Sequence, residues 1–303
     1  MLFKPRKKST ELLTLQYLNS RMKLSAKHKQ HYANLVKGYE GEKKFDLWTV
    51  KLQCDCLILN DLLLEVNNTT FQIDSLIITA DRIYFYEVKN YEGDYLYGPE
   101  KDEFIKKPQH KIVNPLHQME KGETLLNQLL FKNGFKIPIE AAVVFINDEF
   151  TLYQAPPQKP VIYPNQIKRY FNKLNYLSSK LRKHHHLLAE KLMSLHITNP
   201  NYKNIPSYCY EALHKGIFCQ GCKAFSIYIK GEKCICEQCA YEEMTSSAIM
   251  RAVREFQLLF PAKKITAKII QDWCQVFKTR RTIIKVLTQN FEVVGENRWI
   301  HYK

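Results

Sequence analysis

Two pairs of cysteines constrain the fold of this 303-residue chain more than any other feature. Each pair has the spacing C-x₂-C, with CQGC at 219–222 and CEQC at 236–239, and 13 residues separate the pairs. Such an arrangement is typical of a zinc site, and the intervening FSIYIKGEK predicts the strand and turn of a zinc ribbon. A site with four thiolates has no open position, so the zinc would be structural. The predicted ligands are Cys219, Cys222, Cys236 and Cys239, with Cys234 as the competing ligand.

The remaining cysteines depend on the compartment. The chain begins MLFKPRKKS with no apolar stretch behind its basic residues, which does not match a secretory signal. No apolar run approaches the roughly 18–20 residues that a membrane span needs. We therefore expect a cytoplasmic protein without a membrane partner, in which the cysteines outside the pairs are free thiols: Cys54, Cys56, Cys209 and Cys274.

The charge of the chain, net +15, is unevenly distributed. Residues 38–150 carry 12 basic and 19 acidic side chains, net −7. The flanking segments are basic, with net charges of +8 over 1–37, +8 over 151–205 and +6 over 206–303. Basic flanks suit a polyanionic partner such as nucleic acid, and an ordinary solvated surface is the alternative. The acidic block would suit such a partner if some of its carboxylates hold cations.

Apolar periodicity predicts an α/β core in the acidic block. Residues 10–37 predict one or two amphipathic basic helices, and a further helix is expected from about Glu42. The order α-β-β-β-α-β predicts a mixed sheet with helices against it. The clearest strands are Phe71–Thr79, Ile83–Lys89 and Glu140–Ile146, with a helix over Leu116–Leu130 before the third.

A connecting segment follows this core. Residues 151–164 hold four of the twelve prolines and predict a loop. A basic helix is expected from about Asn165 to Leu195. Within it, His184–His186 are interpreted as a solvated face, because three consecutive residues point in different directions on a helix.

The strands FQIDSLIIT and IYFYEVKN place two acids opposite each other. With a turn at Ala80-Asp81, antiparallel partners have numbers that sum to 161, so Asp74 faces Glu87 with Cβ atoms about 5 Å apart. Facing carboxylates beside apolar neighbours are costly unless they are protonated or bridged by a cation such as Mg²⁺. Lys89 would orient or deprotonate a water, or stabilise the charge of a phosphorane. A surface hairpin with an ordinary charge cluster is the alternative.

Four motifs contain or surround these residues: GYEGE (38–42), QID (72–74), YEVKNYEG (86–93) and NPLHQ (114–118). Together they resemble the NERD family, the nuclease-related domain of bacterial proteins, which is similar to the PD-(D/E)xK nuclease superfamily. The resemblance covers about residues 38–150 and implies a restriction-endonuclease-like core. It implies that Asp74 and Glu87 bind Mg²⁺ or Mn²⁺ and that Lys89 is the catalytic lysine. Glu42 would be an accessory acid, and Gln118 would line the site.

The last 61 residues, 243–303, predict three helices and a hairpin, which is the order of a winged helix. The helices are expected in SSAIMRAVREFQLLF, ITAKIIQDWCQVF and TRRTIIKVLTQNF, and the hairpin turn at Gly295-Glu296-Asn297. Thr279 is the expected N-cap of the third helix. Arg280, Arg281 and Lys285 lie at its start, where contacts to bases or phosphates arise. A helical module that docks a partner protein is the alternative.

The sequence thus predicts five segments: a basic amphipathic helical arm (1–37), a nuclease-like domain (38–150), a Pro-rich loop and basic helix (151–205), a zinc ribbon (206–242) and a winged-helix-like domain (243–303). The predicted function is Mg²⁺-dependent hydrolysis of phosphodiester bonds in nucleic acid, with DNA preferred. One rival is a non-catalytic DNA-binding protein that keeps the nuclease fold as a scaffold. The other is an interaction protein whose C-terminal modules dock other proteins.

Overall fold

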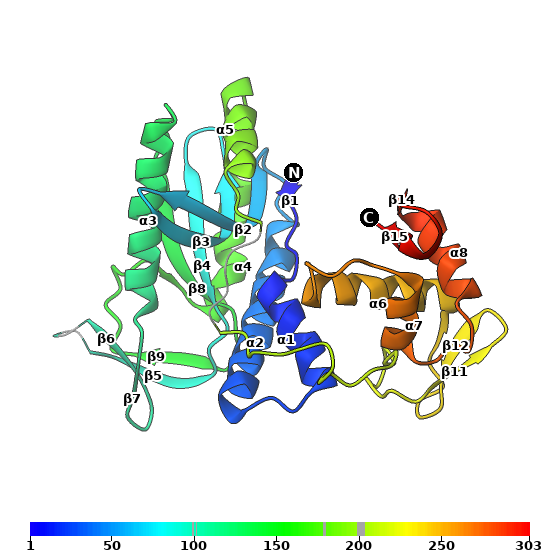
Figure 1. Ribbon diagram of the computed structural model, residues 1–303. Coiled ribbons are helices and arrows are strands. Elements are labelled where there is room, and N and C mark those ends of the chain that lie inside the picture. Colours follow the sequence, from blue (N-terminus) through cyan, green and yellow to red (C-terminus); the bar gives the residue numbers. More distant parts are fainter. Residues whose placement is uncertain (99, 101, 178–179, 199–203) are drawn as a thin grey trace. The chain divides into compact units, whose positions relative to one another are not determined.

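The computed structural model describes residues 1–98, 100, 102–177, 180–198 and 204–303. The chain forms two compact units, each built from segments far apart in the sequence (Figure 1). The first unit comprises Met1–Lys8 and Ala33–Asn201, and the second comprises Ser9–Tyr32 and Tyr202–Lys303. Residues 1–37, predicted as one helical arm, therefore contribute to both units. No helix in the described part of the chain is long and apolar enough to cross a membrane.

A six-stranded mixed sheet forms the centre of the first unit, in the order β1-β2-β3-β4-β8-β10. Neighbouring strands are antiparallel from β2 to β4, whereas β1, β8 and β10 run parallel to the strands they join. The mixed α/β fold class is as predicted. The strands are β1 (Leu2–Lys4), β2 (Leu57–Val66), β3 (Thr69–Ile78), β4 (Ile83–Lys89), β8 (Ile139–Phe145) and β10 (Val161–Ile162).

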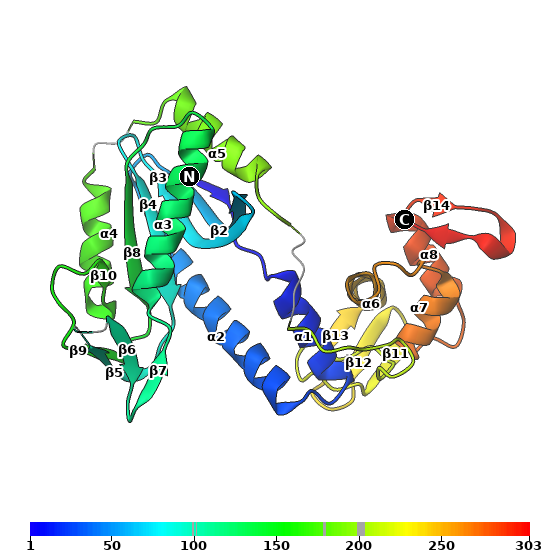
Figure 2. The same cartoon turned by 60° about the vertical axis from the view of Figure 1, so that its left-hand side comes forward.

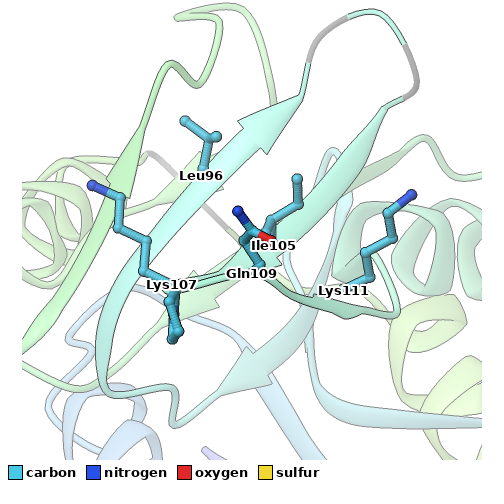
Figure 3. Close-up of a pocket in the computed structure, with 6 residues that line it drawn as sticks. Leu96, Ile105, Lys107, Gln109 and Lys111 are labelled. Atoms are coloured by element: carbon cyan, nitrogen blue, oxygen red, sulfur yellow. The ribbon is translucent and has the colours of Figure 1, made fainter.

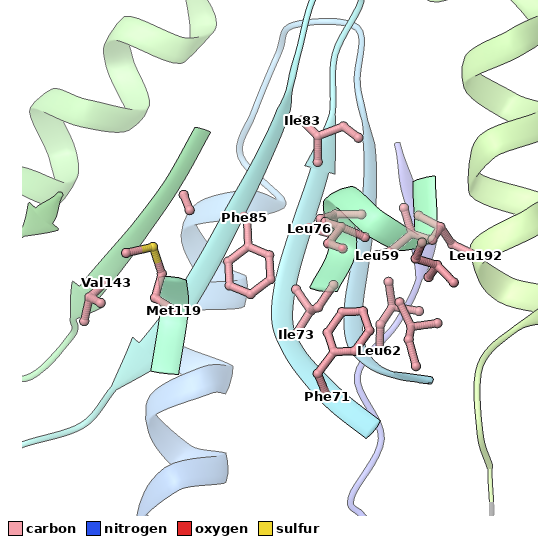
Figure 4. Packing of buried hydrophobic residues seen from close by; sticks show 14 of the residues in the cluster. Leu59, Leu62, Phe71, Ile73, Leu76, Ile83, Phe85, Met119, Val143 and Leu192 are labelled. Atoms are coloured by element: carbon pink, nitrogen blue, oxygen red, sulfur yellow. The ribbon is translucent and has the colours of Figure 1, made fainter. Parts of the chain in front are cut away.

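Helices cover both faces of this sheet (Figure 2). Because side chains alternate along a strand, Ile83 and Phe85 of β4 pack in the core that α3 and α5 complete (Figure 4). Tyr84 and Tyr86 pack on the opposite face, with residues of α2 and α4. Burial on both faces explains the nearly continuous apolar strands. The helices are α2 (Ala26–Thr49), α3 (Pro115–Lys132), α4 (Ile167–Asn175) and α5 (Lys183–Ser194).

Three helical predictions for this unit were wrong. The helix expected from about Glu42 begins at Ala26. The single helix expected over Asn165–Leu195 consists of a 3₁₀ turn, Pro164–Gln166, followed by α4 and α5. His185 is buried rather than solvated: its Nδ1 accepts a hydrogen bond from the Arg182 N–H, and its Nε2 lies 3.1 Å from the Ala80 carbonyl oxygen.

A second sheet of four strands, which the sequence did not predict, forms largely between β4 and α3 in the chain. Its order is β7-β6-β5-β9, and β5 pairs parallel with β9. One face carries Tyr95, Tyr97 and Phe104 into the core of the first unit. The strands are β5 (Gly93–Gly98), β6 (Glu103–Lys106), β7 (His110–Ile112) and β9 (Phe150–Tyr153). Such short strands leave little periodicity to detect.

The described residues of the second unit form an antiparallel sheet, four α-helices and a small hairpin around one core. Leu18, Ile217, Cys234, Phe256 and Leu287 all belong to this core, so the ribbon and the C-terminal helices pack together. Arg280 occupies the N-cap position of the last helix, and Thr279 is not the cap that was expected. The elements are α1 (Thr10–Arg21), β11 (Ile227–Lys230), β12 (Lys233–Cys236), β13 (Glu242–Met244), α6 (Thr245–Leu259), α7 (Ala267–Cys274), α8 (Arg281–Asn290), β14 (Val293–Val294) and β15 (His301–Tyr302).

A buried ion pair ties α1 to α6. Arg21 donates from Nε and Nη2 to Glu255 Oε1 and Oε2 at 2.6 and 2.9 Å, and both side chains are almost fully buried. The guanidinium also donates to the carbonyl oxygens of His214 and Gly216 and lies 3.9 Å from the Trp273 ring centroid. These partners satisfy most of its donors, which a buried charge requires.

Candidate active site and zinc site

The side-chain alternation of two strands shifts by one residue beside the candidate acids. On β2, Leu59 and Leu62 face the same core, although regular alternation would put them on opposite faces. The shift falls at Asp61, whose φ is 55°. On β3 the same shift separates Ile73 from Leu76. Asp74 lies within this shift, where β2 and β3 pair through Asn60–Ser75 and Leu62–Ile73 on either side.

The pairing of β3 with β4 has the register that the sequence predicted. Ser75 lies opposite Tyr86 and Ile78 opposite Ile83, so the numbers sum to 161. The paired residues end at Ser75 and Tyr86, which directly adjoin Asp74 and Glu87 in the sequence. The Asp74 Oδ2 accepts a hydrogen bond of 2.8 Å from the backbone N–H of Val88. Asp74 is 8% exposed and Glu87 is 2% exposed, so both acids are buried.

Lys89 lies at the end of β4 and joins Glu87 to α3. Its Nζ donates to Glu87 Oε1 at 2.6 Å and to Gln118 Oε1 at 3.0 Å. Gln118 is in the first turn of α3, which starts at Pro115 with the Asn114 side chain accepting a hydrogen bond from Leu116 N–H. The structure thus brings together the predicted residues from β4 and α3.

Arg6 is a site residue that the sequence analysis missed. Its side chain is 3% exposed and donates from Nη1 to Glu42 Oε2 at 2.6 Å. Its Nε and Nη2 donate to Asp46 Oδ2 and Oδ1 at 2.9 and 3.0 Å, and Nη2 also reaches the Asp74 carbonyl oxygen at 2.7 Å. Glu42 therefore joins the group through an arginine. In the sequence Arg6 is one of four cations within five residues, and nothing distinguishes it from its neighbours.

Asn90, for which the sequence offered no role, connects two segments behind the site. Its Nδ2 donates to the Lys37 carbonyl oxygen at 2.8 Å, and its Oδ1 accepts from Asn147 Nδ2 at 3.2 Å. A Cβ atom on Gly41 would lie 2.4 Å from the Asn90 Cβ. The glycine is therefore needed for α2 to approach the end of β4.

Burial makes the carboxylates of the site resist ionisation. It raises the pKa of Glu87 to about 8, with Asp74 adding to the increase and Lys89 opposing it. Burial likewise raises the pKa of Glu42 to about 7, with Asp74 adding and Arg6 opposing. The pKa of Asp74 is also raised by burial, against the lowering effect of Lys89 and of the Val88 N–H. Burial lowers the pKa of Lys89, but attraction to Glu87 and Asp74 outweighs it and raises the pKa overall.

Asp74 and Glu87 fit a hard divalent cation. A cation beside them would favour the ionised forms that burial disfavours, and their oxygens suit Mg²⁺ or Mn²⁺. Among the described residues, only the four paired cysteines form a group of three or more ligand atoms within 4.8 Å of one another. Two carboxylates would therefore leave several coordination positions to water or phosphate, as is usual for Mg²⁺.

The four paired cysteines, Cys219, Cys222, Cys236 and Cys239, lie together as predicted and could hold zinc. The sulfurs of Cys219 and Cys239 are 3.5 Å apart, as are those of Cys222 and Cys236. The competing candidate, Cys234, lies outside this group. It is buried, with its Sγ 3.7 Å from Thr245 Oγ1.

The predicted nucleic-acid residues Arg280, Arg281 and Lys285 lie at the start of α8, and all three are exposed. Arg280 Nε donates to Gln271 Oε1 of α7 at 3.1 Å. Between them in the sequence, Ile283 turns inward to the core of the second unit, whereas Ile284 is exposed.

Comparison with known proteins gives one match, which covers the candidate active site. No curated protein and no solved structure was found to match the chain. The model of the nuclease-related domain (NERD) family matches residues 37–146. This range extends from α2 to the end of β8 and includes Glu42, Asp74, Glu87, Lys89 and Gln118. Residues 37–146 are thus similar to the nuclease-related domain family, which suggests a nuclease-related function for this part of the chain.

Proposed function

We propose that this chain is a Mg²⁺- or Mn²⁺-dependent phosphodiester hydrolase that acts on nucleic acid, preferably DNA. The observation that supports the proposal most is the convergence of Asp74, Glu87 and Lys89 on neighbouring strands, with Lys89 Nζ 2.6 Å from Glu87 Oε1. Asp74 and Glu87 would hold the cation. A bound cation would supply positive charge against the phosphate oxygens.

Lys89 would act as a hydrogen-bond donor rather than as a base. Its pKa is raised, so the ammonium form is favoured. An ammonium group can orient an attacking water or stabilise the negative charge of a phosphorane, but it cannot accept a proton. Gln118 would hold Lys89 in place through the hydrogen bond of 3.0 Å from Nζ to Oε1.

A pocket on the small sheet supports a nucleic-acid substrate. It has a volume of about 530 Å³, and Figure 3 shows Lys107 and Lys111 at its edges with Leu96 and Ile105 between them. The strands β5, β6 and β7 of the small sheet follow Lys89 directly in the sequence. Leu96 is only a few residues after Lys89, so even a fully extended chain would separate the two by no more than about 25 Å. Two exposed lysines around an apolar floor suit the phosphates and sugars of a nucleic-acid strand.

The second unit would provide a separate nucleic-acid-binding surface. Arg280 and Arg281 stand at the N-terminal end of α8, where the helix dipole already favours anions. Ile265 forms a bridge with Tyr302 of β15, which places a third extended segment beside the hairpin. This single bridge between α6 and α7 in the sequence and the hairpin after α8 support the winged-helix interpretation. Zinc on the four cysteines would stabilise the neighbouring ribbon.

The decisive experiment is a cleavage assay on the full chain. Labelled single- and double-stranded DNA and RNA are incubated with Mg²⁺, with Mn²⁺ or with EDTA. We expect metal-dependent cleavage of DNA that is lost in Glu87→Gln. Lys89→Ala is assayed beside Lys121→Ala as its matched control. Lys121→Ala removes an exposed lysine of α3 and should cleave normally. Binding without cleavage under every metal condition would instead support the non-catalytic scaffold.

A further inference from the structure

The N-terminal segment lies outside the family match but belongs to the first unit. β1 pairs parallel with β2, and Lys4 and Arg6 follow each other at the alternate positions of an extended chain. Lys4 Nζ donates to the carbonyl oxygens of Asn60 and Asp61 at 2.7 and 2.6 Å. This is the point where the alternation of β2 shifts, so Lys4 holds the irregular backbone opposite Asp74.

Arg6 extends from this segment into the acidic group. Its guanidinium binds the Glu42 carboxylate through one nitrogen and the Asp46 carboxylate through two, and it also binds the Asp74 carbonyl oxygen. The Arg6 side chain is 3% exposed, whereas those of Glu42 and Asp46 are each 19% exposed. An arginine in this position is a permanent cation, because its guanidinium does not lose its proton in proteins.

The charges around the site add a second argument. When ionised, Glu42, Asp46, Asp74 and Glu87 carry four negative charges, and Arg6 and Lys89 supply two positive charges within their hydrogen-bonding groups. The charge of Lys4 is attracted mainly to Asp61. A net charge of −2 remains, which one divalent ion neutralises. A second divalent ion would leave the buried group with excess positive charge.

We propose that Arg6 takes the place of a second metal ion beside Glu42, so that the candidate active site binds one divalent ion. This ion is held by Asp74 and Glu87, and Glu42 is not one of its ligands. The inference rests on the metal site of the proposed function and makes it specific. Arg6 is a positioning residue in this scheme, since it fixes Glu42 and the backbone of Asp74 without contacting the reacting phosphate.

The test counts Mn²⁺ ions bound to the zinc-loaded full chain, from the electron paramagnetic resonance signal of free Mn²⁺. We expect one Mn²⁺ in the wild type and none in Glu87→Gln, which would assign the ion to this site. Arg6→Met should bind a second Mn²⁺ or bind the first roughly tenfold more tightly, because a cation has been removed. Lys7→Met removes an exposed cation one residue along and should behave as the wild type.

The double variant Arg6→Met/Glu42→Gln keeps the net charge of the site. If Glu42 is not a ligand, this variant binds one Mn²⁺ with an affinity within about threefold of the wild type. Two ions in the wild type, or a loss of more than about tenfold in the double variant, would overturn the inference. No bound Mn²⁺ in the wild type would overturn the metal site of the proposed function and the inference with it. If Arg6→Met fails to fold, the number of Mn²⁺ ions bound to the wild type still tests the inference. Arg6→Lys, which keeps a cation at this position, should also bind one ion.

Discussion

Lys89 Nζ lies 2.6 Å from Glu87 Oε1, and the two residues share one face at the end of β4. The same Nζ lies 3.0 Å from Gln118 Oε1, so the ammonium group is held between a strand and the first turn of a helix. Such a fixed donor stabilises charge that develops during a reaction without having to reorganise.

Replacing Lys89 should therefore separate catalysis from binding. Lys89→Ala removes the donor but few substrate contacts, so we expect single-turnover cleavage to fall by roughly 10²–10³-fold, as for the loss of one preorganised donor. DNA affinity in Ca²⁺, measured by fluorescence anisotropy, should change by less than about threefold. Equal losses of binding and cleavage would show that Lys89 mainly holds the substrate.

Metal affinity should increase with pH up to about pH 8. Burial raises the pKa of Glu87 to about 8, and a cation must displace the proton from this ligand carboxylate. Mn²⁺ binding measured at pH 6, 7 and 8 should become tighter at each step. Glu87→Asp, which keeps a carboxylate on a shorter side chain, is the comparison, and a flat profile in the wild type would contradict the assignment of Glu87 as a ligand.

The same groups set the pH dependence of stability when Mg²⁺ and Mn²⁺ are absent. Below pH 4.5, the usual pKa of Glu, Glu87 is protonated in both the folded and the unfolded chain. Between pH 4.5 and about 8 the unfolded chain loses this proton while the folded chain keeps it, so the free energy of unfolding should decrease as pH rises. Urea unfolding at pH 5 and pH 8 should show a smaller decrease in Glu87→Gln than in the wild type. Mg²⁺ should restore stability at pH 8.

Two glycines of α2 should respond to alanine in opposite directions. At Gly41 a Cβ would lie 2.4 Å from the Asn90 Cβ, so Gly41→Ala should lower the free energy of unfolding by about 1–3 kcal/mol. At Gly38 a Cβ would meet nothing within 4 Å, so Gly38→Ala should raise stability by about 0.5–1 kcal/mol through helix propensity. Urea unfolding of both variants tests this. Similar effects at the two positions would mean that α2 does not approach Asn90 closely.

Several parts of this region could be predicted from the sequence because local features determine them. The short connection between β3 and β4 fixes their register, and the predicted sum of 161, which the observed pair Ser75 and Tyr86 has, followed from the turn alone. The beginning of α2 could not be predicted, since among its residues only Gly41, Phe45 and Thr49 are buried. A helix with so little buried surface has a weak apolar period.

Arg6 could not have been found in the same way. Its partners Glu42, Asp46 and Asp74 lie 36, 40 and 68 residues along the chain. Contacts of this kind depend on the parallel pairing of β1 with β2, which a strand of three residues does not reveal in the sequence. The spacing of the cysteine pairs, by contrast, is local and led directly to the observed cluster.

The cysteine cluster makes a separate prediction about zinc. The purified chain should contain one equivalent of zinc by elemental analysis, and the double variant Cys236→Ser/Cys239→Ser should contain none. Cys234→Ser is the control, because Cys234 lies outside the cluster and near Thr245. Unchanged zinc in the double variant together with a loss in Cys234→Ser would reassign the site.

The two proposed nucleic-acid-binding surfaces, at the start of α8 and on the small sheet, can be distinguished by the salt dependence of affinity. Each lost phosphate contact should lower the slope of log affinity against log salt concentration by roughly 0.9 for duplex DNA. Replacing Arg280, Arg281 and Lys285 by alanine should lower the slope by up to about 2.7 while single-turnover cleavage at saturating enzyme is retained. Lys107→Ala/Lys111→Ala should lower the slope by less, up to about 1.8, and should also slow cleavage, because these lysines belong to the unit that holds Lys89. Lys121→Ala, exposed on α3, should leave both unchanged. A wild-type slope in the triple variant would indicate that α8 contacts a partner other than nucleic acid.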